Sequence, residues 1–164
     1  MNRVSVECRD RRLAGDLAVA RKTAGAVLRA ANKDHYAVAL FLLPSSAMHR
    51  LNRRWHGMDR ATNVLSFPEP RGFVHPPRAQ KPVGEIYLCP SYIKARGQDM
   101  RFMIVHGILH LLGYDHIRRQ DRARMERAEK RVCRTIGIPW PYEGEKIVGR
   151  TSGKRSRMSS ISRS

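Results

Sequence analysis

The chain has 164 residues, of which 41% are hydrophobic, and this length accommodates a single domain with a hydrophobic core. Its 32 lysines and arginines against 14 acids give a net charge of +18, which argues against an ordinary enzyme of small metabolites and indicates a polyanionic partner: nucleic acid, the ribosome or an anionic membrane. No apolar run is long enough to cross a membrane, no signal-peptide core is present, and the three scattered cysteines fit a reducing compartment, so a cytoplasmic protein is expected.

Apolar patterns predict three strands and two helices in the first half of the chain. The strands cover residues 4–8, 36–43 and 62–67, and prolines end the second and the third. An amphipathic helix with a basic outer side is expected over residues 10–31. A second helix is expected over residues 45–55, with Ser45 or Ser46 as its N-cap.

The second half of the chain begins with a loop and continues mainly as helix. Residues 68–82 contain five prolines and few long apolar side chains, which predicts a mobile loop. A fourth strand is expected over residues 84–89. Helices are expected over residues 91–98, 100–112 and 118–136, and the last of them is strongly basic.

The end of the chain differs in composition from the rest. Residues 150–164 contain five basic residues, no acid and little that can be buried. Such a composition is typical of a disordered tail, because it cannot offset the entropy lost on folding. The sequence therefore predicts a folded domain over residues 1–149 and a basic tail over residues 150–164.

Three histidines and a glycine form the most specific pattern in the chain. His106 and His110 are four residues apart in a predicted helix that is apolar almost all round, so both imidazoles lie on one helix face. Gly113 provides the left-handed conformation that often ends a helix, and the chain then turns so that His116 can approach the other two. Three imidazoles with an open fourth position are typical of catalytic zinc, so one Zn²⁺ per chain is predicted on these histidines.

The residue after the first histidine restricts the chemistry. The spacing His-x3-His-x2-Gly-x2-His is that of the metzincin zinc peptidases, in which a glutamate follows the first histidine and acts as general base. This chain has Gly107 at that position, which argues against peptide hydrolysis by that route and leaves the metal ligands intact. A zinc metallopeptidase is therefore a distant alternative.

Four segments of the chain form a combination that is found in one known family. They are His-Gly-Ile-Leu-His-Leu-Leu-Gly-Tyr-Asp-His at 106–116, Thr-Asn-Val-Leu-Ser-Phe-Pro at 62–68, Gly84-Glu85-Ile86 and Leu51-Asn52. With these segments the chain resembles the YbeY family of metal-dependent, single-strand-specific endoribonucleases. The resemblance extends over roughly residues 4–140, and the tail lies outside it.

The resemblance implies an α+β fold, in which a four-stranded mixed sheet packs against about five helices. It also implies an endoribonuclease that matures the 3′ end of the small-subunit ribosomal RNA and takes part in ribosome quality control. The expected partners are ribosomal RNA, the small ribosomal subunit and ribosomal or assembly proteins. We expect a monomer that does not associate with membranes.

One position departs from the family pattern. Members usually carry an arginine, which is the family's phosphate-binding or transition-state group, where this chain has His56. A histidine can donate to a phosphate but carries a full charge only when it is protonated, so Arg54 or Arg60 is a candidate replacement. The resemblance places Ser66 in the motif strand, where it either lines the substrate groove or simply packs.

The sequence leaves the attacking group open. It is either a hydroxide generated at the metal or the 2′-hydroxyl of the RNA, and no general base is assigned. Asp115 is the nearest acid, and capping of the turn or support of a ligand is its expected role. The second function class is a non-catalytic RNA-binding factor of ribosome assembly, in which the metal is structural.

Overall fold

The computed structural model describes residues 1–70, 72, 75–76 and 79–142. The predicted basic tail at 150–164 lies outside the described residues. Parts of the predicted loop at 68–82 also lie outside them, namely residues 71, 73–74 and 77–78.

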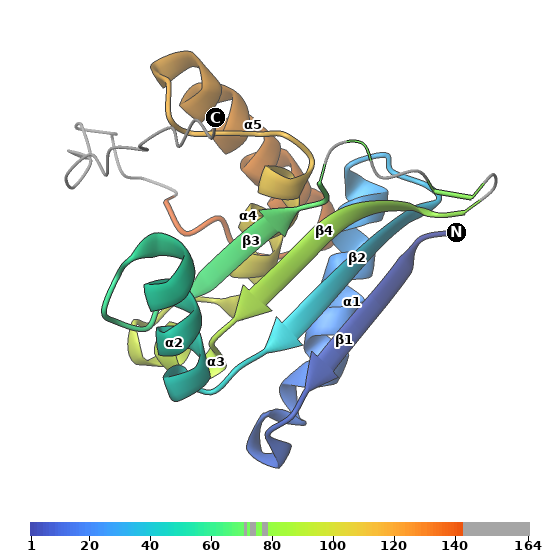
Figure 1. Ribbon diagram of the computed structural model, residues 1–164. Helices are drawn as coiled ribbons and strands as arrows, with labels where there is room; N and C mark the ends of the chain where they lie inside the picture. Colours follow the sequence, from blue (N-terminus) through green and yellow to red (C-terminus); the bar gives the residue numbers. More distant parts are fainter. Residues whose placement is uncertain (71, 73–74, 77–78, 143–164) are drawn as a thin grey trace, which may run out of the picture.

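A mixed four-stranded sheet organises the chain (Figure 1). Its strands are β1 (Arg3–Cys8), β2 (Tyr36–Leu42), β3 (Val64–Pro68) and β4 (Lys81–Leu88), in the order β1-β2-β4-β3. The pairs β1–β2 and β2–β4 are parallel, and β3 is antiparallel to β4. The helices are α1 (Asp16–Ala30), α2 (Ser45–His56), α3 (Pro90–Ala95), α4 (Met100–Leu111) and α5 (Arg119–Ile136). The expected α+β architecture is thereby confirmed.

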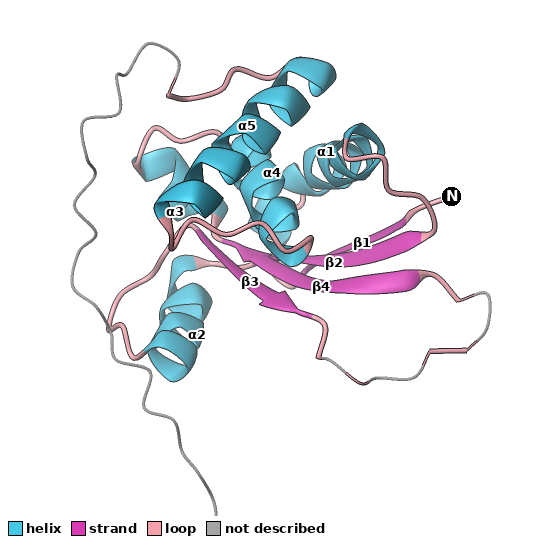
Figure 2. Cartoon of the chain, turned by 90° about the horizontal axis from the view of Figure 1, so that it is seen from above, coloured by secondary structure: helices cyan, strands magenta, loops and turns pink. Residues whose placement is uncertain are grey.

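The two faces of the sheet are covered differently. Helices α1, α4 and α5 lie on one face, which we call the helix-covered face, and α2 lies on the other, which we call the open face (Figure 2). Alternate residues of β2 follow this division, since Val38, Leu40 and Leu42 are buried in the main core while their neighbours are only half-buried. A smaller cluster around Met48 and Leu65 packs between α2 and the open face.

Helix α4 lies at the centre of the main core. It packs against α1, α5, β3 and β4, and eight of its residues are buried. The apolar residues on all sides of this helix, noted in the sequence, are explained by these neighbours. A side chain of α4 is therefore held by the core on several sides, which suits a site that requires fixed geometry.

The predicted starts of one helix and one strand were wrong for local reasons. The helix expected over residues 10–31 is interrupted, because Asp10 caps a short 3₁₀ turn (Arg11–Leu13) and α1 begins only after Gly15. Strand β4 begins at Lys81, inside the predicted loop, because the Lys81 N–H donates to the His35 carbonyl at 2.8 Å. Pro82 is tolerated there since the β2–β4 register shifts beside it.

Strand β3 extends to Pro68, where the sequence predicted an end at Phe67. A proline is accommodated because β3 is the edge strand of the sheet. Its partner is Gly84, whose φ is +131° and where a Cβ atom would lie 2.2 Å from the Phe67 carbonyl oxygen. Only glycine fits this position, so the Gly-Glu-Ile segment is required for the pairing of β3 with β4.

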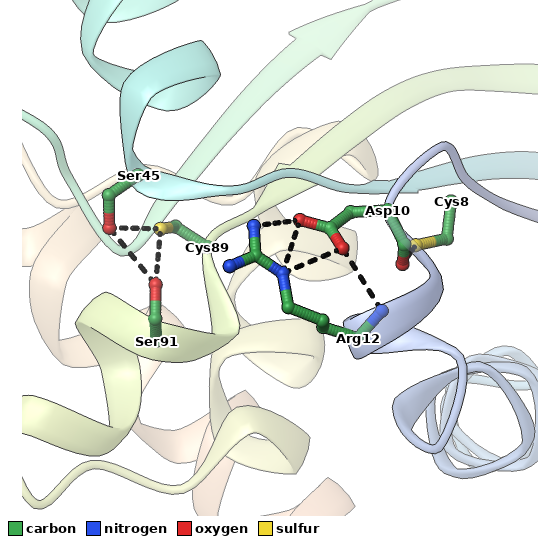
Figure 3. Close-up of polar contacts among 6 residues, drawn as sticks. All are labelled: Cys8, Asp10, Arg12, Ser45, Cys89 and Ser91. Atoms are coloured by element: carbon green, nitrogen blue, oxygen red, sulfur yellow. Dashed lines mark hydrogen bonds and ion pairs between the residues drawn. The ribbon is translucent and has the colours of Figure 1, made fainter.

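The three cysteines are free, in line with the reducing compartment expected from the sequence. Figure 3 shows the Cys89 thiol, which is buried, within hydrogen-bonding distance of Ser45 and Ser91, at 3.5 Å each. It also shows Arg12 bound to both carboxylate oxygens of Asp10 in the turn after β1. Among the described residues, no helix has the length and hydrophobicity that crossing a bilayer requires.

Candidate metal centre

The fold brings His106, His110 and His116 together. Ring nitrogens of the three residues all lie within 4.8 Å of one another. His106 and His110 come from successive turns of α4, and His116 comes from the turn that follows the helix. The ring centroids of His116 lie 4.9 Å from those of His110 and 5.9 Å from those of His106. The sequence prediction that His116 approaches the two helical histidines agrees with this arrangement.

The turn after α4 is built to return the chain towards the helix. Gly113 has a φ of +92°, and the N–H groups of Gly113 and Tyr114 donate back to the carbonyls of His110 and Leu109 at 3.0 Å. The Asp115 carboxylate then accepts from the backbone N–H of His116 at 2.6 Å. This confirms Asp115 as a capping residue, which fixes the backbone from which the His116 ring projects.

A buried carboxylate orients the first histidine. Glu129 of α5 lies with its oxygen 2.8 Å from Nδ1 of His106, and its side chain is only 6% exposed. An imidazole that donates from Nδ1 to a carboxylate presents the lone pair of Nε2 on the opposite side of the ring. Nε2 of His106 indeed points towards Nε2 of His110, at 3.2 Å.

The site favours neutral imidazoles. Burial, followed by the charges of His106 and His116, lowers the pKa of His110 to about 4. Burial and the charge of His106 also lower the pKa of His116. A metal ion requires the lone pair of a neutral imidazole, and the lowered pKa values keep His110 and His116 in that form at neutral pH.

The donor set fits a metal ion such as zinc. Two nitrogens that each lie about 2.0–2.1 Å from a tetrahedral zinc are about 3.3 Å apart, close to the separation of the two Nε2 atoms. Three nitrogen ligands leave one position for water or substrate, as in catalytic zinc sites. The three-histidine cluster could therefore hold a metal ion.

Gly107 lies where a zinc peptidase carries its glutamate, and the packing leaves little room for a side chain there. A Cβ atom here would lie 3.0 Å from Cδ1 of Ile86 and 3.1 Å from Oγ of Ser66. The position faces the sheet, and glycine allows α4 to lie close against β3 and β4. The structure thus gives a steric reason for the glycine and weighs further against the peptidase alternative.

The basic side chains predicted to contact the substrate lie around the end of α2. Arg54 and His56 are exposed on its last turn, and Arg60 is exposed in the loop that follows. Asn52 is 5% exposed and donates from Nδ2 to the Arg60 carbonyl at 2.7 Å. The Leu-Asn segment therefore shapes the loop that carries these basic side chains. Among the described residues, no hydrogen bond or ion pair joins His56 to the three histidines.

Residues of the strand motif connect β3 to the metal helix. Ser66 is half-buried on the helix-covered face. Its side chain lies beside Gly107, the residue that follows His106 in α4. Asn63 donates from Nδ2 to Gln98 at 3.1 Å and to Sδ of Met103 at 3.3 Å, and so ties the start of β3 to α4. Ser66 is thus a predicted substrate residue that lies next to the helix carrying two of the three histidines.

Sequence reasoning missed two residues of α5. Glu129 lies on the apolar stripe of α5, together with Met125, Ala128 and Val132. An acid on a buried stripe is costly unless it has a partner, and that was the available signal. Arg122 is the second, since its positive charge helps to lower the pKa of His116.

Comparisons with known proteins point to one family. The family model described as endoribonuclease YbeY matches residues 6–137. A protein named endoribonuclease YbeY from Nitrobacter hamburgensis is 33% identical over 115 residues, which cover 64% of this chain and 60% of the relative. One of the same name from Rhodopseudomonas palustris is 34% identical over 119 residues, covering 68% of this chain and 63% of the relative. The match thus spans less than two thirds of the length of these curated relatives.

A solved structure also resembles the chain. It is a solution structure of a protein from Thermotoga maritima, with 24% identity and a TM-score of 0.46. The similarity covers 92% of this chain and the whole of that one.

Proposed function

Because the chain belongs to the YbeY endoribonuclease family, we propose that it is a metal-dependent endoribonuclease that cleaves single-stranded RNA. The observation that carries the proposal is the cluster of His106, His110 and His116, whose ring nitrogens lie within 4.8 Å of one another. The net charge of +18 supports a polyanionic substrate.

The three histidines are the proposed ligands of one Zn²⁺. When bound, zinc supplies a Lewis acid for a phosphoryl oxygen and lowers the pKa of a coordinated water to about 7. Glu129 holds the His106 ring in the tautomer whose Nε2 faces the site. Asp115 fixes the backbone of His116, so both the helical and the turn ligand are oriented before metal binds.

Basic side chains around the site are the proposed RNA contacts. Arg122, whose charge acts on His116, is the proposed phosphate contact on the side of α5. Arg54, His56 and Arg60 form a second group at the end of α2, and we assign phosphate binding to them. Ser66, beside Gly107, is placed to donate to the RNA backbone near the first ligand.

We propose ribosomal RNA as the substrate and the small ribosomal subunit as the place where the protein acts, in the cytoplasm and as a monomer. Support comes from the strongly basic composition and from the family to which the chain belongs.

The domain of residues 1–149 carries the proposed activity, and the five basic residues of 150–164 add sequence-independent affinity for RNA. Deleting 150–164 should then weaken RNA binding and flatten its salt dependence while turnover at saturating RNA persists.

The decisive experiment measures cleavage and metal in one sample. Purified protein is incubated with single-stranded RNA, with double-stranded RNA and with a denatured protein, before and after chelation and zinc restoration. The proposal expects cleavage of single-stranded RNA alone, lost on chelation and recovered with zinc. Tight RNA binding without cleavage in a protein that contains stoichiometric zinc would favour the non-catalytic assembly factor instead.

A further inference from the structure

The open face of the sheet carries a row of aromatic side chains that the metal centre does not use. The Phe41 and Tyr87 rings are stacked at 4.8 Å, and Phe67 meets Tyr87 edge-on at 5.6 Å. Trp55 of α2 continues the row, with its ring 5.5 Å from that of Phe67. These residues come from β2, β4, β3 and α2, so the row crosses three strands and reaches the helix. Trp55 is 60% exposed, which is unusual for a side chain that is otherwise part of a cluster.

A groove lies at the exposed end of this row. It has a volume of about 300 Å³ and is walled by Trp55, Phe67 and Tyr87, with prolines of the β3 end on one side. Two acids, Glu69 and Glu85, also line it. We call it the open-face groove. The Tyr87 hydroxyl donates to Glu85 at 2.7 Å, which fixes the direction of that carboxylate.

The charges at the two sides of the open-face groove differ in sign. Glu85 is exposed, and among the described residues no lysine or arginine forms an ion pair with it. On the α2 side, the Arg54 guanidinium lies 5.9 Å from the Trp55 ring, and the last turn of α2 also carries Arg53 and His56. A ligand that matches the groove has a flat apolar body, hydrogen-bond donors at one end and negative charge at the other.

A nucleotide has this distribution, and a basic peptide does not. The base stacks on aromatic rings, its amino and imino groups donate to carboxylates, and its phosphate pairs with arginine. An arginine-rich peptide would satisfy Glu69 and Glu85 but would be repelled by Arg54. Guanine fits best, because its adjacent N1–H and N2–H₂ groups donate together to the two oxygens of one carboxylate, whereas uracil offers a single donor.

We propose that the open-face groove is a base-binding subsite that holds one nucleotide of the RNA, with a preference for guanine read by Glu85. Trp55 supplies the stacking surface, and Arg54 holds the adjoining phosphate. Because β3 is the edge strand, a single RNA strand can pass around it from this groove to the helix-covered face, where Ser66 and the histidines lie. The subsite deepens the proposed function and rests on RNA being the substrate.

The test measures binding of short oligonucleotides to the zinc-loaded protein. The probes are 2′-O-methyl pentamers of uridine with guanosine, adenosine, cytidine or uridine at the centre, which remain intact during titration. Trp55 fluorescence reports stacking, since Trp140 is only 7% exposed. The pentamer with guanosine should bind most tightly and quench Trp55. Trp55→Leu should weaken its binding roughly 5- to 150-fold, and Trp55→Tyr should restore most of it.

The carboxylate is tested by its effect on base preference. Glu85→Gln should reduce the affinity for the guanosine pentamer to that for the uridine pentamer and leave the latter unchanged. Glu7→Gln is the matched control, because it removes the same charge from an exposed position on β1, outside the groove. Circular dichroism and zinc content should be equal in all variants.

Three outcomes would overturn the subsite. They are equal binding of the four pentamers, an unchanged guanosine preference in Glu85→Gln, or quenching of Trp55 by an arginine-rich peptide at lower concentration than by any pentamer. Cleavage measured in the same preparations separates the two proposals. Cleavage without base preference overturns the subsite alone, whereas a guanosine preference in a protein that does not cleave RNA overturns the proposed activity alone.

Discussion

The two faces of the sheet handle polar chemistry in opposite ways. On the helix-covered face, His106 is half-buried, and its partner Glu129 is fixed between α4 and α5 with a side chain that is 6% exposed. On the open face, Trp55 is 60% exposed and Glu85 is exposed at the wall of a groove. The helix-covered face holds the side chains of His106 and Glu129 in a fixed geometry. The open face presents exposed side chains that a ligand can contact.

This difference follows from what surrounds each group. Helix α4 is enclosed by α1, α5, β3 and β4, so an imidazole on it has few alternative rotamers. Helix α2 contacts the open face through the small cluster around Met48 and Leu65 and through Trp55, which lies on its largely exposed last turn. Chemistry that needs a fixed geometry is therefore expected on the helix-covered face. Recognition of a flexible chain is expected on the open face.

The largest effect is expected from removing one of the three proposed metal ligands on the helix-covered face. His110→Ala should abolish both stoichiometric zinc and RNA cleavage, because two imidazoles do not hold a site of this kind. Zinc is measured by elemental analysis and cleavage by single-turnover assay on the same sample. His35→Asn is the control, since it removes an exposed histidine at a φ of 59° that asparagine tolerates. Retention of both zinc and activity in His110→Ala would refute the three-histidine assignment.

The second prediction compares one substitution at two helical glycines. Gly107→Glu should destabilise the protein by at least about 3 kcal/mol. The new side chain would be forced against Ile86 and Ser66, and its buried carboxylate would have no positively charged partner. Gly25→Glu on α1 should instead stabilise by up to about 1 kcal/mol, through helix propensity and a pair with Arg29 four residues on. Urea unfolding followed by circular dichroism measures both. A Gly107→Glu protein as stable as the original would show that α4 does not pack against the sheet as described.

The third prediction concerns the carboxylate behind the first ligand. Glu129→Gln should weaken zinc affinity about 10- to 100-fold, because it removes the negative charge that orients and polarises His106. Competition with a chromophoric chelator gives the dissociation constant. Glu126→Gln, three residues earlier on α5, removes an equal charge and should leave the affinity unchanged. Equal zinc affinities for the two variants would reduce Glu129 to a packing role.

The site on the helix-covered face was easier to predict from the sequence than the groove on the open face. The spacing of His106, His110, Gly113 and His116 is contained in eleven consecutive residues, and helix geometry converts it directly into a cluster. Glu129 lies 23 positions from His106, and only the packing of α5 on α4 brings them together. Tertiary contact of this kind leaves a weak sequence signal, in this instance one acid on an apolar stripe.

The open face was hardly predictable. Its aromatic row draws one residue from each of four elements, and alternation along a strand does not reveal which strands become neighbours. Strand order β1-β2-β4-β3 sets Phe41 beside Tyr87, although 46 positions separate them. The local errors had the same origin, since Lys81 and Pro82 join β4 only because the backbone of β2 lies alongside.

The smallest effect is expected at His56, on the last turn of α2, where the chain departs from the family pattern. If this side chain binds phosphate, a planar and permanently charged guanidinium should bind it better, because charge-assisted hydrogen bonds are about twice as strong as neutral ones. His56→Arg should raise the single-turnover cleavage rate roughly fivefold, and His56→Ala should lower it by a similar factor.

Stability should not change in either variant, since the position is exposed. Zinc content, measured in each sample, should also be equal, as His56 lies outside the histidine cluster. Arg50→Ala on an earlier turn of the same helix removes a charge from an exposed position and serves as the control. Equal rates for the original protein and both His56 variants would assign phosphate recognition to Arg54 and Arg60 instead, and the open face would then contribute through its groove and those two arginines alone.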